Sequence, residues 1–135
     1  MGKAFIIHGK AKQAVEIITD LLATPGTISI EHSAIKAIVG QEGNVLICIG
    51  SGAGKDRVIE ACQDALNNSR KEADIKQATK VLVNITGPTD LLLKEVNDGL
   101  DIVKESVSPT AEIIFGVTRG GTLHNQAKVT LVAVT

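Results

Sequence analysis

The sequence predicts one α/β domain: a two-layer sandwich with helices packed on a four-stranded mixed sheet, preceded by a long N-terminal helix. Three observations favour this class. The chain has 135 residues, a length typical of a single compact domain. Hydrophobic residues make up 44% of it, enough for a continuous core. Apolar runs typical of strands alternate with segments of helical spacing, which favours strand–helix–strand units with right-handed crossovers.

The first third of the chain has a helical pattern. Between Lys10 and Ala23, apolar residues recur with the helical period, at positions 11, 14, 15, 18, 21 and 22. Pro25-Gly26 ends this helix, because proline disfavours helical geometry in the residue before it. A second, shorter helical pattern follows within residues 35–39.

Four later segments are predicted as strands. They are residues 44–50 (NVLICIG), 80–87 (KVLVNITG), 112–118 (EIIFGVT) and 127–135 (AKVTLVAVT). The unbroken apolar run of the first predicts burial on both of its faces. The second and third are expected in the interior of the sheet. The last two are joined by a short glycine-rich link, RGGTLHNQ, and are expected to form an antiparallel hairpin.

Two helices are predicted between these strands. The first follows residues 44–50, and its apolar stripe is Val58, Ala61, Cys62, Ala65 and Leu66. The second follows residues 80–87, and its apolar positions are 92, 93, 96, 100, 103 and 107. Within the second helix, residues 93, 96, 100 and 103 are expected to face the sheet.

The composition narrows the possible functions. The formal net charge is −1, from 14 basic and 15 acidic residues, so no overall field attracts nucleic acid or an anionic membrane. Only Phe5 and Phe115 are aromatic, which argues against base-stacking platforms. Cys48 and Cys62 lie in apolar patterns and are expected to be buried free thiols. With no secretory leader and no apolar run of the ~18 residues that a membrane span needs, a cytoplasmic location is expected.

The stretch LICIGSGAGKDR, residues 46–57, raises the question of a phosphate site. The P-loop pattern G-x-x-x-x-G-K-[ST] fails, because Asp56 follows Gly54-Lys55 where a hydroxyl would bind magnesium. The dinucleotide pattern G-x-G-x-x-G fails because the glycines stand at 50, 52 and 54. An acid at a helix N-terminus is favourable by itself but repels a phosphate. We therefore expect the glycines to form a tight strand-to-helix turn.

Several motifs of the chain belong together. They are ICIGSGAGKDRVIEACQDAL (47–66), KVLVNITGPTDLLLKEVNDGLDIV (80–103), AEIIFGVT (111–118) and KVTLVAVT (128–135). In this order they resemble the second domain of FtsZ, the bacterial tubulin homologue, with its G-I-G, E-x-R-A, V-L-x-N-I-T-G, D-L-x-L-x-E-V, N-I-I-F-G-A and R-V-T-V-I-A-T motifs. Residues 14–31, AVEIITDLLATPGTISIE, resemble the end of that family's central helix and the loop after it. The resemblance runs from about Ala4 to Thr135.

The resemblance implies a domain division and a role. Residues 1–26 would be the end of the central helix, and residues 27–135 the C-terminal domain. In this family a GTP-binding domain comes first, and its G-G-G-T-G-T-G phosphate loop has no counterpart here. GTP and magnesium are implied for the full-length protein, but this chain alone is not expected to bind or hydrolyse GTP. The implied role is that of a cytoplasmic cell-division GTPase whose subunits assemble head to tail into filaments, without nucleic acid or direct membrane contact.

The resemblance also implies a functional loop. In the family, a loop of pattern N-x-D-F-A-D inserts over the GTP of the next subunit, where its carboxylates polarise the attacking water. The matching stretch, residues 29–34 (SIEHSA), departs from that pattern, and Ala34 replaces the second Asp. Glu31 replaces the first Asp and is the one candidate catalytic acid, although the first turn of a short helix also favours an acid at this position. The candidate interface residues are Gly26, Ser29, Glu31, His32 and Ala34.

Two other functions stay open at this point. One is a small-molecule enzyme or ligand-binding domain, since compact α/β domains host many functions. Against it, no nucleophile–base pair or metal-ligand cluster is visible in the sequence, and the three histidines lie in separate segments. The other is a stand-alone FtsZ-like regulator that caps filaments. Asp90, Glu95 and Asn97 are interpreted as structural residues that shape the start of a helix and its exposed face.

Overall fold

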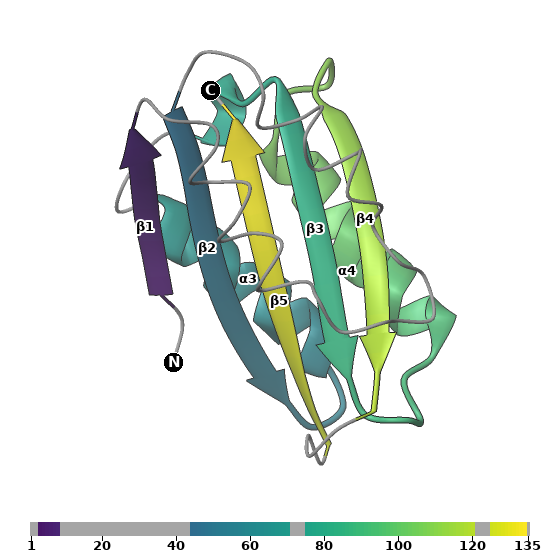
Figure 1. The fold of residues 1–135 in the computed structure, drawn as a ribbon. Coiled ribbons are helices and arrows are strands. Elements are labelled where there is room, and N and C mark those ends of the chain that lie inside the picture. The colour runs from purple at the N-terminus through teal and green to yellow at the C-terminus, as the bar shows by residue number, and fades with distance from the viewer. Residues whose placement is uncertain (1–2, 9–43, 71–74, 121–124, 135) are drawn as a thin grey trace.

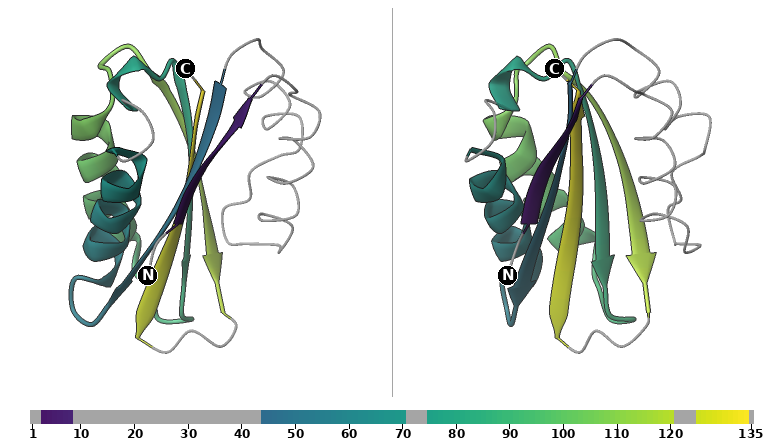
Figure 2. Two further views of the ribbon diagram at one scale, coloured as in Figure 1. Left: turned by 90° about the vertical axis from the view of Figure 1, so that its left-hand side faces the viewer. Right: turned by 60° about the vertical axis from the view of Figure 1, so that its left-hand side comes forward.

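The computed structural model describes residues 3–8, 44–70, 75–120 and 125–134, which form one sheet with helices packed on one of its faces (Figures 1 and 2). In chain order the elements are β1 (Lys3–His8), β2 (Asn44–Ala53), α3 (Arg57–Arg70), a short 3-10 helix (Ile75–Gln77), β3 (Lys80–Gly87), α4 (Leu93–Ser106), β4 (Glu112–Arg119) and β5 (Gln126–Val134).

The sheet has the strand order β1-β2-β5-β3-β4 (Figure 1). β3 and β4 are parallel, and α4 forms the crossover between them. β5 is the last strand of the chain, yet it lies between β2 and β3 and is antiparallel to both. β2 and β3 therefore run in the same direction, as the strand–helix–strand pattern predicts, but β5 separates them.

The predicted α/β class is confirmed, and the four predicted strands form a mixed sheet. Within the described residues the sheet contains one strand more than predicted, because β1 pairs antiparallel with β2 from Lys3↔Ile49 to His8↔Asn44. These residues belong to the segment that the resemblance assigned to the central helix. A short apolar run suits a helix or a strand, and the free edge of β2 offers backbone partners that no local pattern reveals. The helix predicted over residues 10–23 lies outside the described residues.

Two predictions about strand position are wrong. The third predicted strand, β4, lies at an edge of the described sheet and not in its interior. β4 and β5 run antiparallel, as predicted, but they form no hairpin, because β3 lies between them. The physical reason is burial: β5 is buried at every residue from Val129 to Val134, whereas β4 exposes Glu112, Phe115 and Arg119. The more apolar strand takes the central place, where both of its faces are covered.

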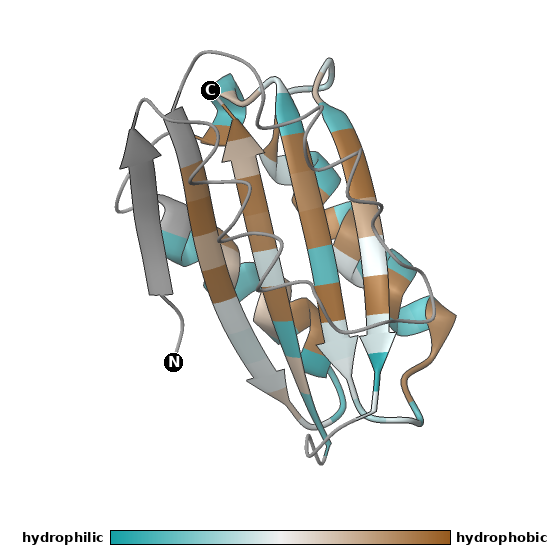
Figure 3. Ribbon diagram, viewed as in Figure 1, coloured by the Kyte–Doolittle hydropathy of each residue, from teal (hydrophilic) through white to brown (hydrophobic). Residues whose placement is uncertain are grey.

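The core lies mainly between the sheet and the two helices. All five residues of the predicted α3 stripe are buried. Alternate residues of β2 behave differently: Leu46 and Cys48 join the core cluster that faces the helices, whereas Ile47 is fully buried outside that cluster. Burial on both faces is therefore confirmed for this part of β2. Figure 3 shows the corresponding hydrophobic bands along β2, β5 and β3.

The predicted stripe of α4 is correct for three of its four residues. Val96, Leu100 and Val103 are buried, but Leu93 is 53% exposed. α4 begins at Leu93, and helical side chains lean toward the N-terminus of their helix. A side chain in the first turn therefore projects past the packed part of α4. Leu91, just before the helix, is buried in the core.

Two glycines of β2 allow α3 to lie directly on the strand. A Cβ added at Gly50 would overlap backbone atoms of Ala61 and Ala65, and one added at Gly52 would overlap the carbonyl oxygen of Arg57. Of the three glycines expected in the turn, only Gly54 lies there, with a φ of +83° and open space around it. The other two serve close helix–strand packing, a known use of glycine in strands.

Candidate functional site

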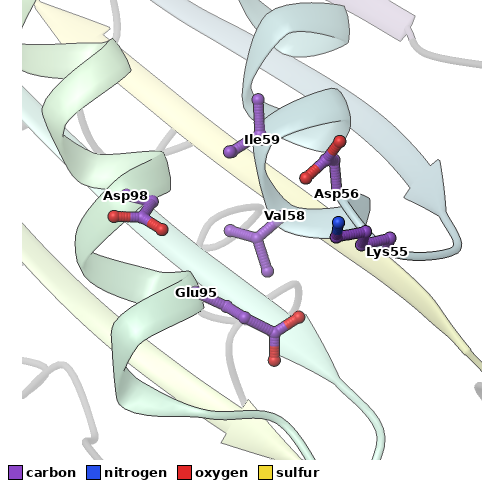
Figure 4. Close-up of a pocket in the computed structure, with 6 residues that line it drawn as sticks. All are labelled: Lys55, Asp56, Val58, Ile59, Glu95 and Asp98. Atoms are coloured by element: carbon purple, nitrogen blue, oxygen red, sulfur yellow. The ribbon is translucent and has the colours of Figure 1, made fainter.

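A polar cleft of about 500 Å³ lies between the first turns of α3 and α4. Its lining residues are Gly54, Lys55, Asp56, Arg57, Asp90, Leu92, Lys94, Glu95, Asp98 and Asn125. Figure 4 shows a smaller hollow in this region, with Glu95 and Asp98 extending from α4 and Lys55 and Asp56 where the chain enters α3. The structure thus brings the glycine turn together with Asp90 of the β3–α4 connection and with Glu95 and Asp98 of α4, which the sequence places about 40 residues away.

Arg57 is the central residue of this cleft. It is the first residue of α3 and is 6% exposed. Its guanidinium makes two parallel hydrogen bonds with the Glu95 carboxylate, Nε to Oε1 at 2.9 Å and Nη2 to Oε2 at 3.0 Å. Nη2 also lies 3.3 Å from Oδ1 of Asp90, whose side chain is 79% exposed. Such a bidentate ion pair fixes the position of α3 relative to α4, and it also compensates the buried charge of Arg57.

Glu95 joins this ion pair to the start of α4. Its Oε2 also accepts a hydrogen bond from the backbone N–H of Leu92 at 2.9 Å. Leu92 is the N-cap residue and Glu95 stands three residues later, so the contact is the acidic half of a capping box. Leucine has no side-chain oxygen to provide the other half. One carboxylate therefore caps α4 and binds α3.

Both members of the pair are charged at neutral pH. Desolvation acts to raise the pKa of Glu95, but the hydrogen bonds from Arg57 and Leu92 and the charge of Arg57 outweigh it, so the pKa lies below its ordinary value. The hydrogen bond to Glu95 raises the pKa of Arg57, although burial opposes this. Each partner stabilises the charged form of the other, so the two side chains form an ion pair at neutral pH.

The charge of the cleft disfavours a phosphate. Its lining contains three basic and four acidic side chains. The buried cation, Arg57, already has Glu95 and Asp90 as partners. Lys55 is exposed, and the backbone carbonyl oxygen of Asp56 beside it accepts the first hydrogen bond of α3, from the N–H of Glu60 at 2.8 Å. The geometry therefore supports a structural ion-pair site at the glycine turn.

Other chemistry is scarce in the described part of the chain. Within it, no group of three or more His, Cys, Asp or Glu side chains is placed to hold a metal ion. Cys48 and Cys62 are buried and form no disulfide, as predicted, and burial raises the pKa of Cys62 to about 12. A thiol with such a pKa is protonated and unreactive at neutral pH. None of the described helices has the length and apolarity needed to cross a membrane.

The site residues predicted from the family loop are not placed by the structure. Gly26, Ser29, Glu31, His32 and Ala34 all lie outside the described residues, so their roles stay predictions.

The structural interpretation of Asp90 and Glu95 is confirmed by their contacts with Arg57, and Asn97 is exposed on α4. The role of Arg57 was not predicted. Its partner lies 38 residues away, so the only sequence signal was a glutamate three residues after a predicted helix start.

Comparison with known proteins decides which family this fold represents. Residues 43–135 match the model of the C-terminal domain of the FtsZ family. The chain belongs to the FtsZ family. The resemblance seen in the sequence motifs is therefore confirmed, and residues 43–135 form an FtsZ C-terminal domain. The division between residues 26 and 27 stays a prediction.

Individual FtsZ relatives agree with this assignment. The cell division protein FtsZ of Mycoplasmopsis pulmonis is 33% identical over 122 residues, which are 90% of this chain and 31% of that protein. A solved structure of an empty FtsZ dimer from M. jannaschii superimposes with a TM-score of 0.76 at 32% identity, covering 91% of this chain and 36% of that chain. This chain thus spans about a third of the length of these FtsZ proteins.

A more distant structure shares the fold alone. CetZ1 from Haloferax volcanii, in a GDP-bound monomer, is 15% identical, with a TM-score of 0.56 over 77% of this chain and 33% of that chain.

Proposed function

We propose that this chain is the C-terminal part of a cell-division GTPase of the FtsZ type. In this role it contributes a subunit–subunit contact and the loop that reaches the GTP of the neighbouring subunit. The observation that carries the proposal is the match to FtsZ over 90% of the chain at 33% identity. The M. jannaschii relative was solved as a dimer, which supports self-association as the mode of action. The partners would be like subunits in a head-to-tail filament in the cytoplasm.

The proposed division of labour follows from the length of the chain. GTP and magnesium would be bound by the part of an FtsZ protein that this chain does not span. This chain would supply residues 26–34 to the nucleotide of the next subunit, with Glu31 as the single carboxylate able to orient the attacking water. Because Ala34 stands where the family has a second acid, hydrolysis should be slow.

The ion pair at the cleft supports this role through rigidity. Arg57 and Glu95 join the first turns of α3 and α4, and both helices pack on the same face of the sheet (Figure 2). A domain whose two helices are joined by an ion pair can form a subunit contact at one end of the sheet without changing its own shape. The pair is thus proposed as part of the scaffold, and the loop as the part that meets the partner.

The test is GTP-dependent assembly and phosphate release by a full-length protein that contains this chain. Restoring the family pattern with Glu31→Asp and Ala34→Asp should raise phosphate release on the order of 10²-fold, and Glu31→Ala should abolish the residual activity. Glu105→Ala, which removes an exposed acid of α4, is the matched control and should behave like the original protein. Brisk hydrolysis that survives Glu31→Ala would remove the loop from the chemistry, and failure to assemble with GTP would overturn the proposed function.

A further inference from the structure

We draw no further inference here: the strongest candidate, the polar cleft between the first turns of α3 and α4, belongs to the ion-pair site already described, because its buried cation Arg57 is committed to Glu95 and Asp90 and no second observation among the described residues indicates a ligand.

Discussion

Replacing Arg57 with alanine should destabilise the domain more than replacing any exposed charged residue with alanine. The variant removes two hydrogen bonds of 2.9 and 3.0 Å to Glu95 and leaves that carboxylate without its cation. Breaking a fully buried ion pair from one side costs about 3–5 kcal/mol. The Glu95 side chain is 21% exposed and keeps the Leu92 N–H, so part of its charge is rehydrated. We expect Arg57→Ala to lower the free energy of unfolding by about 2–4 kcal/mol.

Matched variants separate the ion pair from simple loss of packing. Arg57→Lys keeps the charge but loses the bidentate geometry, and should cost about 1–2 kcal/mol. Asp90→Ala removes the exposed partner at 3.3 Å and should cost less than about 1 kcal/mol, as for surface ion pairs. A double-mutant cycle with Glu95→Gln should give a coupling energy of at least about 1 kcal/mol, since residues in direct contact do not act additively.

The assay is urea unfolding followed by far-ultraviolet circular dichroism, because the chain has no Trp or Tyr for fluorescence. The midpoint and slope give the free energy of unfolding for each variant. The reasoning is refuted if Arg57→Ala costs under about 0.5 kcal/mol, the range of ordinary surface substitutions. A coupling energy near zero between Arg57→Ala and Glu95→Gln would show that the two side chains lie next to each other without stabilising the fold through their contact.

Three further predictions concern pH, the strand glycines and the glycine turn. Because folding lowers the pKa of Glu95, its contribution is complete above its ordinary pKa of 4.5 and is lost as the pH falls through the lower folded value. The stability difference between the original protein and Glu95→Gln should therefore shrink from pH 7 to pH 3, and a constant difference would contradict this assignment. Gly50→Ala should lower the free energy of unfolding by about 3 kcal/mol or more, because the new Cβ would overlap the backbone of α3. Gly54→Ala should lower it by only about 1 kcal/mol, because alanine is strained at the positive φ of this residue. Equal losses of stability for the two variants in urea unfolding would argue against the close α3–β2 contact. Calorimetric titration of the chain with magnesium-GTP should show no micromolar binding, and binding abolished by Lys55→Ala would identify a phosphate site at the turn.

Much of this fold follows from local patterns. The apolar stripe of α3, the approximate residue ranges of β2 to β5 along the chain and the burial of both cysteines could be predicted, because each depends on the period of hydrophobic residues over one element. The motif order was enough to indicate the family, since it depends on residue identities alone. The candidate loop, residues 26–34, could be proposed only from its resemblance to the loop of that family.

The remaining features depend on which distant segments meet. The central place of β5, the edge position of β4 and the pairing of β1 with β2 are choices among backbone hydrogen-bond partners, and every strand offers the same donors and acceptors. The pairing of Arg57 with Glu95 is likewise non-local, because it requires α3 and α4 to lie side by side with their first turns level. The period of the hydrophobic residues indicates which face of an element is apolar, but it does not indicate which other element will pair with that element or pack on it. These contacts can therefore be read only from the tertiary structure.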